Sequence, residues 1–409
     1  MLHRDPKGPP PLRRVLLGKA RLWDMRGDRA ACLTGQMAGG VNHHRLQAAC
    51  PQINAQQITH QNLPRFRITR SLRCMSSTAQ LDPALVPATM AGLQIPIIDF
   101  APFLAGNPAE RAATAEAIGR ACREIGFFYV INHGIEAALI ADVYAQAKRF
   151  FDLPVAAKST IAIENSACHR GWFQVGGENL DPAKQKAAGD LKEGIKIGRD
   201  LPATHSLVLA KTPLHGPNQW PENLPGWREV MQTYYDRMTG LGTEMLRAFA
   251  VSLNLDAHYF DRWLTSPMTT LGPLHYPPQR GPITEAQIGA GAHTDFGCLT
   301  LLAQDAVGGL QVRTKTGLWV EAPPVVGSFV VNIGDMMQRW TNDVFTSTLH
   351  RVVNVSGRER YSLPFFFDPD FSAEVAPIGP NPRYAPTTAG QYLLDKINES
   401  FAYHQDKTQ

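Results

Sequence analysis

The carboxyl-terminal half of the sequence predicts a mainly β fold, a jelly-roll or related barrel with flanking helices. From about residue 269 short β segments follow one another, each bounded by Gly, Pro, Asn or Asp: 298–302, 309–312, 328–333, 350–355 and 361–367. No helical pattern of ten or more residues separates them. Antiparallel pairing is therefore expected, rather than an alternating β-α-β array.

Two helices and two strands are predicted upstream of this β region. A helix begins at Asn107, an N-cap residue followed by a helix-starting proline and a capping-box glutamate, and ends at Gly126. Apolar runs at 95–99 and 127–131 predict short buried strands on either side of it. A second amphipathic helix follows and ends before Pro154.

The next part of the chain predicts long loops and then one long helix. Residues 155–225 are rich in Gly, Pro and polar residues, which indicates little regular structure, and apolar spacing predicts a helix over about 228–253. Four regions result: an extension at 1–90, a helix and strand module at 91–225, the long helix and jelly-roll core at 226–370, and a carboxyl-terminal tail or helix at 371–409.

Charge is distributed unevenly along the chain. Residues 1–80 hold 13 Lys and Arg against three acidic residues, although the whole chain has a net charge of only +4. Without apolar periodicity, this segment is predicted to be a disordered extension or read-through upstream of a start at Met75; an organelle transit peptide is the alternative. The remaining, mildly acidic body lacks the basic surface that nucleic acid needs.

Composition indicates a soluble protein with a sizeable core. Hydrophobic residues make up 44% and aromatic residues 9%, and no apolar run is long enough to cross a membrane. The six cysteines are scattered without a C-x-x-C motif, which favours free thiols in a reducing compartment. A cytoplasmic monomer without nucleic-acid or membrane partners is expected, with organelle import through the basic N terminus as the alternative.

Three side chains form a candidate metal site. His293 and Asp295 are two residues apart, so on an extended chain they point to the same face. His350 lies on another predicted strand 57 residues later. Two imidazoles and one carboxylate leave three positions open on an octahedral ion, as in non-haem iron(II) oxygenases. His293, Asp295 and His350 are therefore the predicted ligands of a catalytic Fe(II).

A candidate carboxylate site follows on the last predicted strand. Arg360 and Ser362 share a face, and an arginine fork with a neighbouring hydroxyl suits a carboxylate. A dicarboxylate such as 2-oxoglutarate would chelate iron through its 2-oxo acid end while these two residues hold the far carboxylate. Tyr276 offers a phenolic hydrogen bond to that same end. His169 to Trp172 are candidates for the mouth of the substrate site.

The sequence resembles the isopenicillin N synthase-like family of 2-oxoglutarate/Fe(II)-dependent dioxygenases. Its motifs occur in family order: I-P-I-I-D-F (95–100), G-F-F-Y-V-I-N-H-G (126–134), H-T-D (293–295), N-I-G-D (332–335), H-R-V (350–352) and R-Y-S-L-P-F-F (360–366). One departure is Leu274, which stands where many plant members have Asn. The resemblance implies a double-stranded β-helix, or cupin-like, core, Fe(II) on the H-x-D…H triad and 2-oxoglutarate on the R-x-S pair.

The activity implied by this resemblance couples oxidative decarboxylation of 2-oxoglutarate, to succinate and CO2, to hydroxylation or desaturation of a small organic molecule. O2 is the second co-substrate, and ascorbate is expected to support turnover. Two alternatives remain open: an iron oxidase or oxidative cyclase that needs no 2-oxoglutarate, and a non-catalytic binding protein on the same scaffold. A nucleic-acid demethylase is opposed by the acidic body. Loops at 155–225 and the segment after Asp368 are expected to set substrate selectivity.

Overall fold

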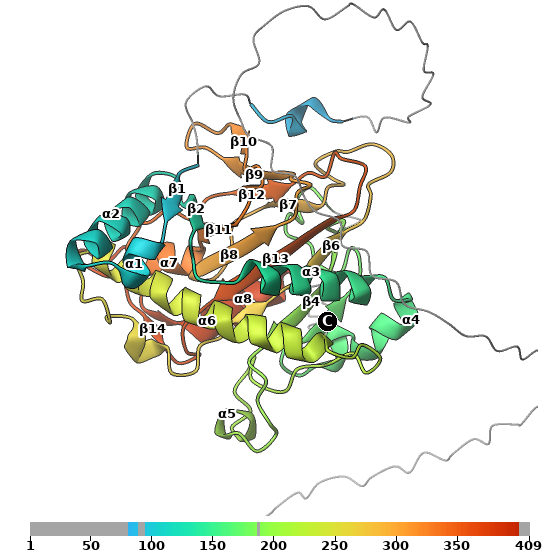
Figure 1. The fold of residues 1–409 in the computed structure, drawn as a ribbon, viewed down its shortest axis with the longest axis horizontal. Coiled ribbons are helices and arrows are strands. Elements are labelled where there is room, and N and C mark those ends of the chain that lie inside the picture. Colours follow the sequence, from blue (N-terminus) through green and yellow to red (C-terminus); the bar gives the residue numbers. More distant parts are fainter. Residues whose placement is uncertain (1–80, 89–94, 186–188, 401–409) are drawn as a thin grey trace, which may run out of the picture. The chain divides into compact units, whose positions relative to one another are not determined.

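The computed structural model describes residues 81–88, 95–185 and 189–400. Within these ranges, two β-sheets and the helices that cover one of them make up the fold, as Figure 1 shows. The larger sheet has nine strands, in the order β1-β2-β11-β8-β13-β5-β4-β3, with β6 paired to both β13 and β4. The smaller sheet has four strands, in the order β10-β9-β12-β7.

The strands of the larger sheet come from most of the chain. They are β1 (Ile97–Asp99), β2 (Phe127–Ile131), β3 (Gly171–Phe173), β4 (Glu193–Gly198), β5 (Thr270–Leu271), β6 (Leu274–Tyr276), β8 (Leu299–Gln304), β11 (Ser328–Ile333) and β13 (Arg360–Phe367). The smaller sheet contains β7 (Ala290–His293), β9 (Leu310–Arg313), β10 (Trp319–Glu321) and β12 (His350–Val352), and β14 (Glu374–Val375) pairs with β15 (Thr387–Thr388). Apart from the parallel β1–β2 pair, these neighbours run antiparallel, as predicted.

Side chains alternate between two cores because successive residues of a strand point to opposite faces. On β2, Phe128 and Val130 belong to the core beneath the helices, whereas Phe127 and Tyr129 belong to the core between the two sheets. The second core also contains Val312 and other side chains of the smaller sheet. This sheet-on-sheet arrangement is the jelly-roll core that the sequence predicts.

Helices cover the outer face of the larger sheet, and Figure 1 shows α6 and α3 side by side over its strands. A Cβ on Gly242 of α6 would lie 2.2 Å from the ring of Phe367 on β13, so this helix lies directly against the sheet. None of the described helices is both long and apolar enough to cross a membrane. The α-helices are α1 (Ala101–Ala105), α2 (Pro108–Glu124), α3 (Ala137–Phe151), α4 (Val155–Lys158), α5 (Ser206–Leu209), α6 (Trp227–Ser252), α7 (Asp335–Trp340) and α8 (Ala389–Ser400).

The long helix and the capped helix form where the sequence predicts them. The side chain of Asn107 accepts hydrogen bonds from the first turn of α2, and Glu110 accepts one from the Asn107 amide, which completes the capping box. Helix α6 spans Trp227–Ser252 against a prediction of 228–253. The short strand predicted at 95–99 forms as β1, but it is buried only at Ile98, because Ile97 is 53% exposed.

The prediction that 155–225 holds little regular structure was wrong at two places. Strands β3 and β4 lie within it, pair with each other and extend the larger sheet beyond β5 and β6. Gly272-Pro273 separates β5 from β6, and the Ile195 amide of β4 donates to the Pro273 carbonyl oxygen across this break at 3.1 Å. The loop-rich segment therefore contributes to the sheet that carries the site.

Residues 81–88, which the sequence analysis assigned to the extension, pack against the barrel. Leu85 is fully buried, and its carbonyl oxygen accepts a hydrogen bond of 3.0 Å from Gln311 of β9. Arg351 of β12 donates to the carbonyl oxygen of Ala84 at 2.9 Å. Ordered chain therefore begins before residue 95. The remainder of the predicted extension, apart from these eight residues, lies outside the described residues.

Candidate metal centre and active site

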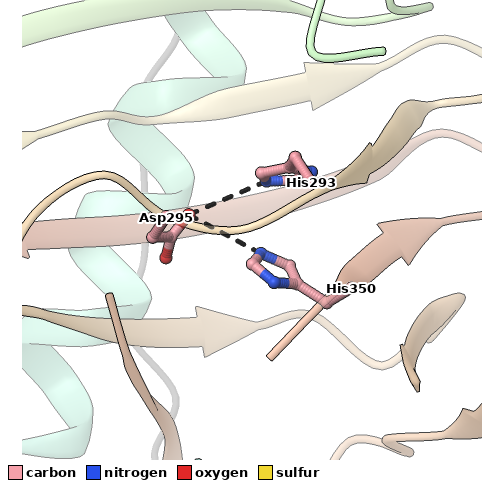
Figure 2. Close-up of side chains that lie close together, drawn as sticks. All are labelled: His293, Asp295 and His350. Carbon is pink, nitrogen blue, oxygen red and sulfur yellow. Dashed lines mark ion pairs between the residues drawn. The ribbon is translucent and has the colours of Figure 1, made fainter. Parts of the chain in front are cut away.

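His293, Asp295 and His350 come together at one end of the smaller sheet. His293 is the last residue of β7, His350 is the first of β12, and the two are directly opposed in the antiparallel pairing of these strands. The Nε2 atoms of His293 and His350 lie 3.7 and 3.6 Å from the same oxygen, Oδ1 of Asp295. Figure 2 shows both imidazoles pointing toward that carboxylate. One ligand atom from each residue lies within 4.8 Å of the others, which suits a single metal ion.

The backbone fixes which nitrogen of each imidazole is available. Nδ1 of His293 lies 2.8 Å from the Gly291 carbonyl oxygen, and Nδ1 of His350 lies 3.1 Å from that of Thr348. Because a carbonyl oxygen only accepts, both Nδ1 atoms carry the proton and both Nε2 lone pairs face Asp295. Burial, together with the neighbouring His350, lowers the pKa of His293 to about 3, so its imidazole is neutral at physiological pH.

The carboxylate of Asp295 is oriented by two donors. Its Oδ2 accepts hydrogen bonds from Asn332 Nδ2, at 2.7 Å, and from Thr300 Oγ1, which leaves Oδ1 directed at the histidines. Burial raises the pKa of Asp295, but the positive charge that His350 and His293 carry when protonated, together with the Asn332 and Thr300 donors, outweighs it, and the pKa is lowered overall. The ionised carboxylate that a cation needs is therefore the favoured form.

The turn that carries Asp295 is held by Asp335, the last residue of the N-I-G-D motif. Asp335 begins α7, and its Oδ2 accepts a hydrogen bond from Thr294 Oγ1 at 3.0 Å. Its amide donates to the Asp295 carbonyl oxygen at 2.8 Å. The N-I-G-D motif thus supplies two side chains that position the candidate ligand Asp295, one from Asn332 and one from Asp335. Their role was missed because both act across the sheet rather than along the chain.

The candidate carboxylate site lies on β13. Arg360 and Ser362 are almost completely buried and line the same cavity as the triad. Nε of Arg360 donates to the Gly308 carbonyl oxygen at 2.6 Å and Nη2 to Gln304 Oε1 at 3.4 Å. The buried Nη1 has no hydrogen-bond partner among the described residues. The Arg360 guanidinium lies over the ring of Tyr276, 4.6 Å from its centroid, since β6 and β13 pair at this position. Tyr276 is therefore placed to support the guanidinium with its ring.

One cavity joins these groups to the loop-rich segment and the carboxyl-terminal helix. His169 and Arg170 line it, as the sequence analysis suggested, whereas Trp172 faces away and donates to Glu193. Leu393 and Ile397 of α8 line the cavity too. The segment after Asp368 thus reaches the site through α8. The sequence analysis predicted a carboxyl-terminal tail or helix at 371–409 without assigning individual residues of it to the site.

A buried charge cluster at the cavity wall was not predicted. Lys192 Nζ lies 2.8 Å from Glu178 and also contacts Asp190, and Lys196 lies 3.7 Å from Glu178. Oδ1 of Asp190 accepts a hydrogen bond from the Gly291 amide at 2.8 Å, two residues before His293. The cluster therefore supports β7. Two lysines four residues apart, Lys192 and Lys196, within the strand-like stretch 191–198 were the available signal.

His275, which the sequence analysis left out of the site, faces a different group of residues. Its Nδ1 lies 2.9 Å from Glu193 Oε1, and its ring stacks on Tyr361 at 4.8 Å. Glu193 also contacts Lys158 at 2.7 Å. This second buried cluster links β4, β6 and α4, on the side of the sheet opposite the cavity. Cys298 is fully buried, and burial raises the pKa of its thiol.

Comparison with known proteins places this geometry in a family. Residues 95–223 match the family described as the N-terminal part of non-haem dioxygenase in morphine synthesis, and residues 259–369 match the 2OG-Fe(II) oxygenase superfamily. The chain belongs to the 2-oxoglutarate/Fe(II)-dependent oxygenases. The resemblance read from the sequence motifs is thereby confirmed, as is the jelly-roll fold class.

Several named relatives cover most of the chain. The 2-oxoglutarate-Fe(II) type oxidoreductase hxnY of Emericella nidulans is 37% identical over 323 residues, which are 76% of this chain and 92% of the relative. A homoarginine-6-hydroxylase of Arabidopsis thaliana is 37% identical over 327 residues, 75% and 89% of the two chains. A full-length Neurospora crassa protein, solved in complex with alpha-KG and thymine, matches with a TM-score of 0.66 at 33% identity, over 77% of this chain and 99% of that chain.

Membership in this family identifies the protein as an enzyme, a 2-oxoglutarate-dependent iron oxygenase that acts on a small molecule with O2. Fe(II) and 2-oxoglutarate are its cofactor and co-substrate. The donor set fits this chemistry, since two imidazoles and one carboxylate suit Fe(II) with open positions. The buried Nη1 donor of Arg360 in the same cavity fits an acidic co-substrate.

Proposed function

We propose that His293, Asp295 and His350 bind the catalytic iron and that Arg360 and Ser362 bind the distal carboxylate of 2-oxoglutarate. The convergence of two histidine Nε2 atoms on Asp295 Oδ1 supports the first assignment. Both protonated Nδ1 atoms bond backbone carbonyls, so the imidazoles are held in the tautomer that a metal requires.

The observation that carries the second assignment is the orphaned Nη1 of Arg360. A buried guanidinium nitrogen without a partner is costly, and a carboxylate in the cavity would satisfy it. The Tyr276 ring and the Gly308 carbonyl oxygen hold the remainder of the guanidinium in place. This fixed orientation presents one free N–H direction to the cavity, next to the Ser362 hydroxyl on the same face of β13.

Each part of the chain then has a defined task in the reaction. Bound iron, with 2-oxoglutarate as reductant, supplies the activation of O2 that the protein itself lacks. The triad holds the metal, Arg360 and Ser362 orient the co-substrate, and the apolar cavity wall excludes water. Because several relatives are named hydroxylases, we propose hydroxylation of a small organic molecule as the reaction, rather than desaturation.

The decisive experiment is a titration of 2-oxoglutarate against O2 uptake and succinate formation, with Fe(II) and ascorbate present. Alanine at His293, Asp295 or His350 should abolish turnover and sharply weaken Fe(II) binding in a folded protein. Arg360→Lys keeps the charge but loses the directed Nη1 donor, whose charge-assisted hydrogen bond contributes roughly 1.5–3 kcal/mol, so the KM for 2-oxoglutarate should rise about 10- to 150-fold.

Ser362→Ala should act in the same direction with a smaller effect, because a neutral hydroxyl contributes on the order of 1 kcal/mol. Iron binding should be preserved in both variants. Turnover in the parent that is indifferent to 2-oxoglutarate would instead support an oxidative cyclase and remove the co-substrate assignment. Near-normal turnover and stoichiometric iron in any triad variant would remove that residue from the ligand set.

A further inference from the structure

Asp368 is an acidic side chain in the active-site cavity and is not part of the proposed iron and 2-oxoglutarate sites. It follows the end of β13 and lines the cavity together with Asp295 and Phe296. The residue is only 5% exposed, yet its one hydrogen-bond donor among the described residues is the Cys298 amide, which lies 2.7 Å from Oδ1. No lysine, arginine or histidine of the described chain pairs with it.

A buried carboxylate of this kind is costly to keep. Carboxylates inside proteins are normally paired with a cation or saturated with donors, since water is no longer there to solvate the charge. Burial raises the pKa of Asp368 to about 7, because one backbone amide offsets the desolvation only in part and the charge of Asp295 adds to it. None of the described residues therefore gives this carboxylate a positively charged partner.

The backbone makes room for this carboxylate beside the metal site. A Cβ on Gly297 would lie 2.0 Å from Asp368 Oδ1 and 2.8 Å from Oδ2, so no side chain could be accommodated there. Gly297 is two residues after Asp295. The close approach therefore sets the Asp368 carboxylate against the turn that carries a candidate iron ligand.

The position of Asp368 along β13 separates it from the co-substrate. Arg360, Ser362, Pro364 and Phe366 alternate along the cavity face of the strand, and Asp368 continues this series beyond its end. Six residues of strand separate Arg360 from Phe366, roughly 20 Å at 3.3 Å per residue. Phe366 pairs with Thr300, whose hydroxyl bonds Asp295, so Asp368 lies at the metal end and Arg360 at the far end. The dianionic co-substrate is attracted to Arg360 and repelled by Asp368.

We propose that Asp368 binds a positively charged N–H group of the primary substrate, such as an amine, amidine or guanidinium, and so positions a neighbouring C–H bond at the metal. This assignment deepens the proposed function and rests on it, since it takes the Arg360 end of the cavity as the 2-oxoglutarate site. The substrate class is a small nitrogenous cation with an apolar portion that contacts side chains such as Met268, Phe296 and Leu393.

The test compares three probes that share one ring: benzamidine (a cation with N–H donors), benzamide (neutral with N–H donors) and benzoate (an anion). Binding is measured by calorimetry under nitrogen at about pH 8, where a carboxyl group of this kind is ionised, with Fe(II) and saturating 2-oxoglutarate present. The parent should bind benzamidine at least about tenfold more tightly than benzoate, as expected for one charge-assisted hydrogen bond.

Asp368→Asn keeps the shape and the acceptor for the Cys298 amide but removes the charge. This variant should bind benzamidine at least about tenfold more weakly than the parent does. Its affinity for benzamide should change less than about threefold, and its affinity for benzoate should not fall. Asp368→Ser, a smaller neutral variant, should behave in the same way. Asp256→Asn, which removes one exposed carboxylate outside the cavity, is the matched control and should leave all three affinities unchanged.

A parent that binds benzamidine no better than benzoate, or a preference that survives both Asp368 variants, overturns the assignment. The titration of 2-oxoglutarate described above separates this outcome from a failure of the proposed function. Normal dependence on 2-oxoglutarate with no cation preference removes only the role of Asp368. Loss of that dependence in the parent removes the foundation on which the role rests.

Discussion

Asn332 donates from Nδ2 to Oδ2 of Asp295 at 2.7 Å, and this contact turns the other carboxylate oxygen toward the two histidines. The contact joins the two sheets, since Asn332 lies on β11 of the larger sheet and Asp295 follows β7 of the smaller one. Asn332 is only 3% exposed, so water does not readily replace its amide. The orientation of a candidate metal ligand thus depends on a side chain that does not itself reach the metal.

Asn332→Ala should weaken Fe(II) binding by about 10- to 100-fold, because partners that orient a ligand contribute that much to metal affinity. The concentration of Fe(II) needed for half-maximal turnover should rise accordingly, and activity should recover at high iron. Asn354→Ala is the control, since Asn354 is equally buried but bonds to the 356–358 turn. An unchanged iron requirement in the Asn332 variant would show that Thr300 alone orients the carboxylate.

The amino-terminal boundary can be tested with two truncated chains. A chain beginning at Met75 retains residues 81–88 and should fold and turn over like the parent. A chain beginning at Ile95 loses the buried Leu85 and leaves Gln311 and Arg351 without their acceptors. Burial of one leucine contributes about 1.5–3 kcal/mol, so this chain should unfold at a clearly lower urea concentration. Equal urea midpoints for the two chains would mean that the 81–88 contacts add nothing to stability.

Lys192→Met should destabilise the protein by about 3–5 kcal/mol, because it leaves Asp190 and Glu178 as buried charges without their main partner. Chemical unfolding measures the effect. The exposed pair between Arg237 and Glu136 provides the control, and Arg237→Met should cost less than about 1 kcal/mol. If the two variants lose similar amounts of unfolding free energy, the buried cluster is no more important to stability than a surface pair.

Asp368 should make the stability of the metal-free protein fall between about pH 4 and pH 7. Burial raises its pKa to about 7, above the value of about 3.9 in an unfolded chain, so the folded state holds the proton more tightly. The stabilisation is present below pH 4 and is lost as the pH rises to 7. Asp368→Asn removes this effect, and the two proteins should diverge by up to about 1.4 kcal/mol per pH unit in that window. If the free energies of unfolding of the two proteins change with pH in the same way across this window, the prediction is contradicted.

The local sequence pattern was sufficient to predict those helices and strands whose signals lie within a few residues of one another. The capping box at Asn107 and the apolar stripe of α6 depend on neighbours one to four positions away, and both helices form close to their predicted limits. The triad could be picked out for a similar reason. His293 and Asp295 are two positions apart in sequence, and His350 lies on a strand of its own with alternating polarity.

Residues whose role arises from pairing across the sheet could not be found in this way. Strands β3 and β4 are short and lie among turn residues, so their pairing with β5 and β6 is set by tertiary contacts rather than by local propensity. Asp368 follows an aromatic run that is typical of a core strand. That no cation pairs with it in the described part of the chain becomes visible only in the folded structure. The residue type and spacing were sufficient to identify Arg360 as a candidate. They did not predict that its Nη1 would be buried without a hydrogen-bond partner among the described residues.

The short strand β7 lies at the edge of the smaller sheet, where unpaired backbone groups invite another chain to add a strand. Its Gly291 amide is instead occupied by the Asp190 carboxylate, and a Cβ at Gly291 would lie 2.6 Å from Gln185 and 2.7 Å from Asp181. The side chains of Asp181, Gln185 and Asp190 therefore cover this edge and prevent another chain from adding a strand to it. The same loop that brings charge to the cavity wall also acts against self-association, so variants that loosen it are expected to aggregate before they lose their jelly-roll.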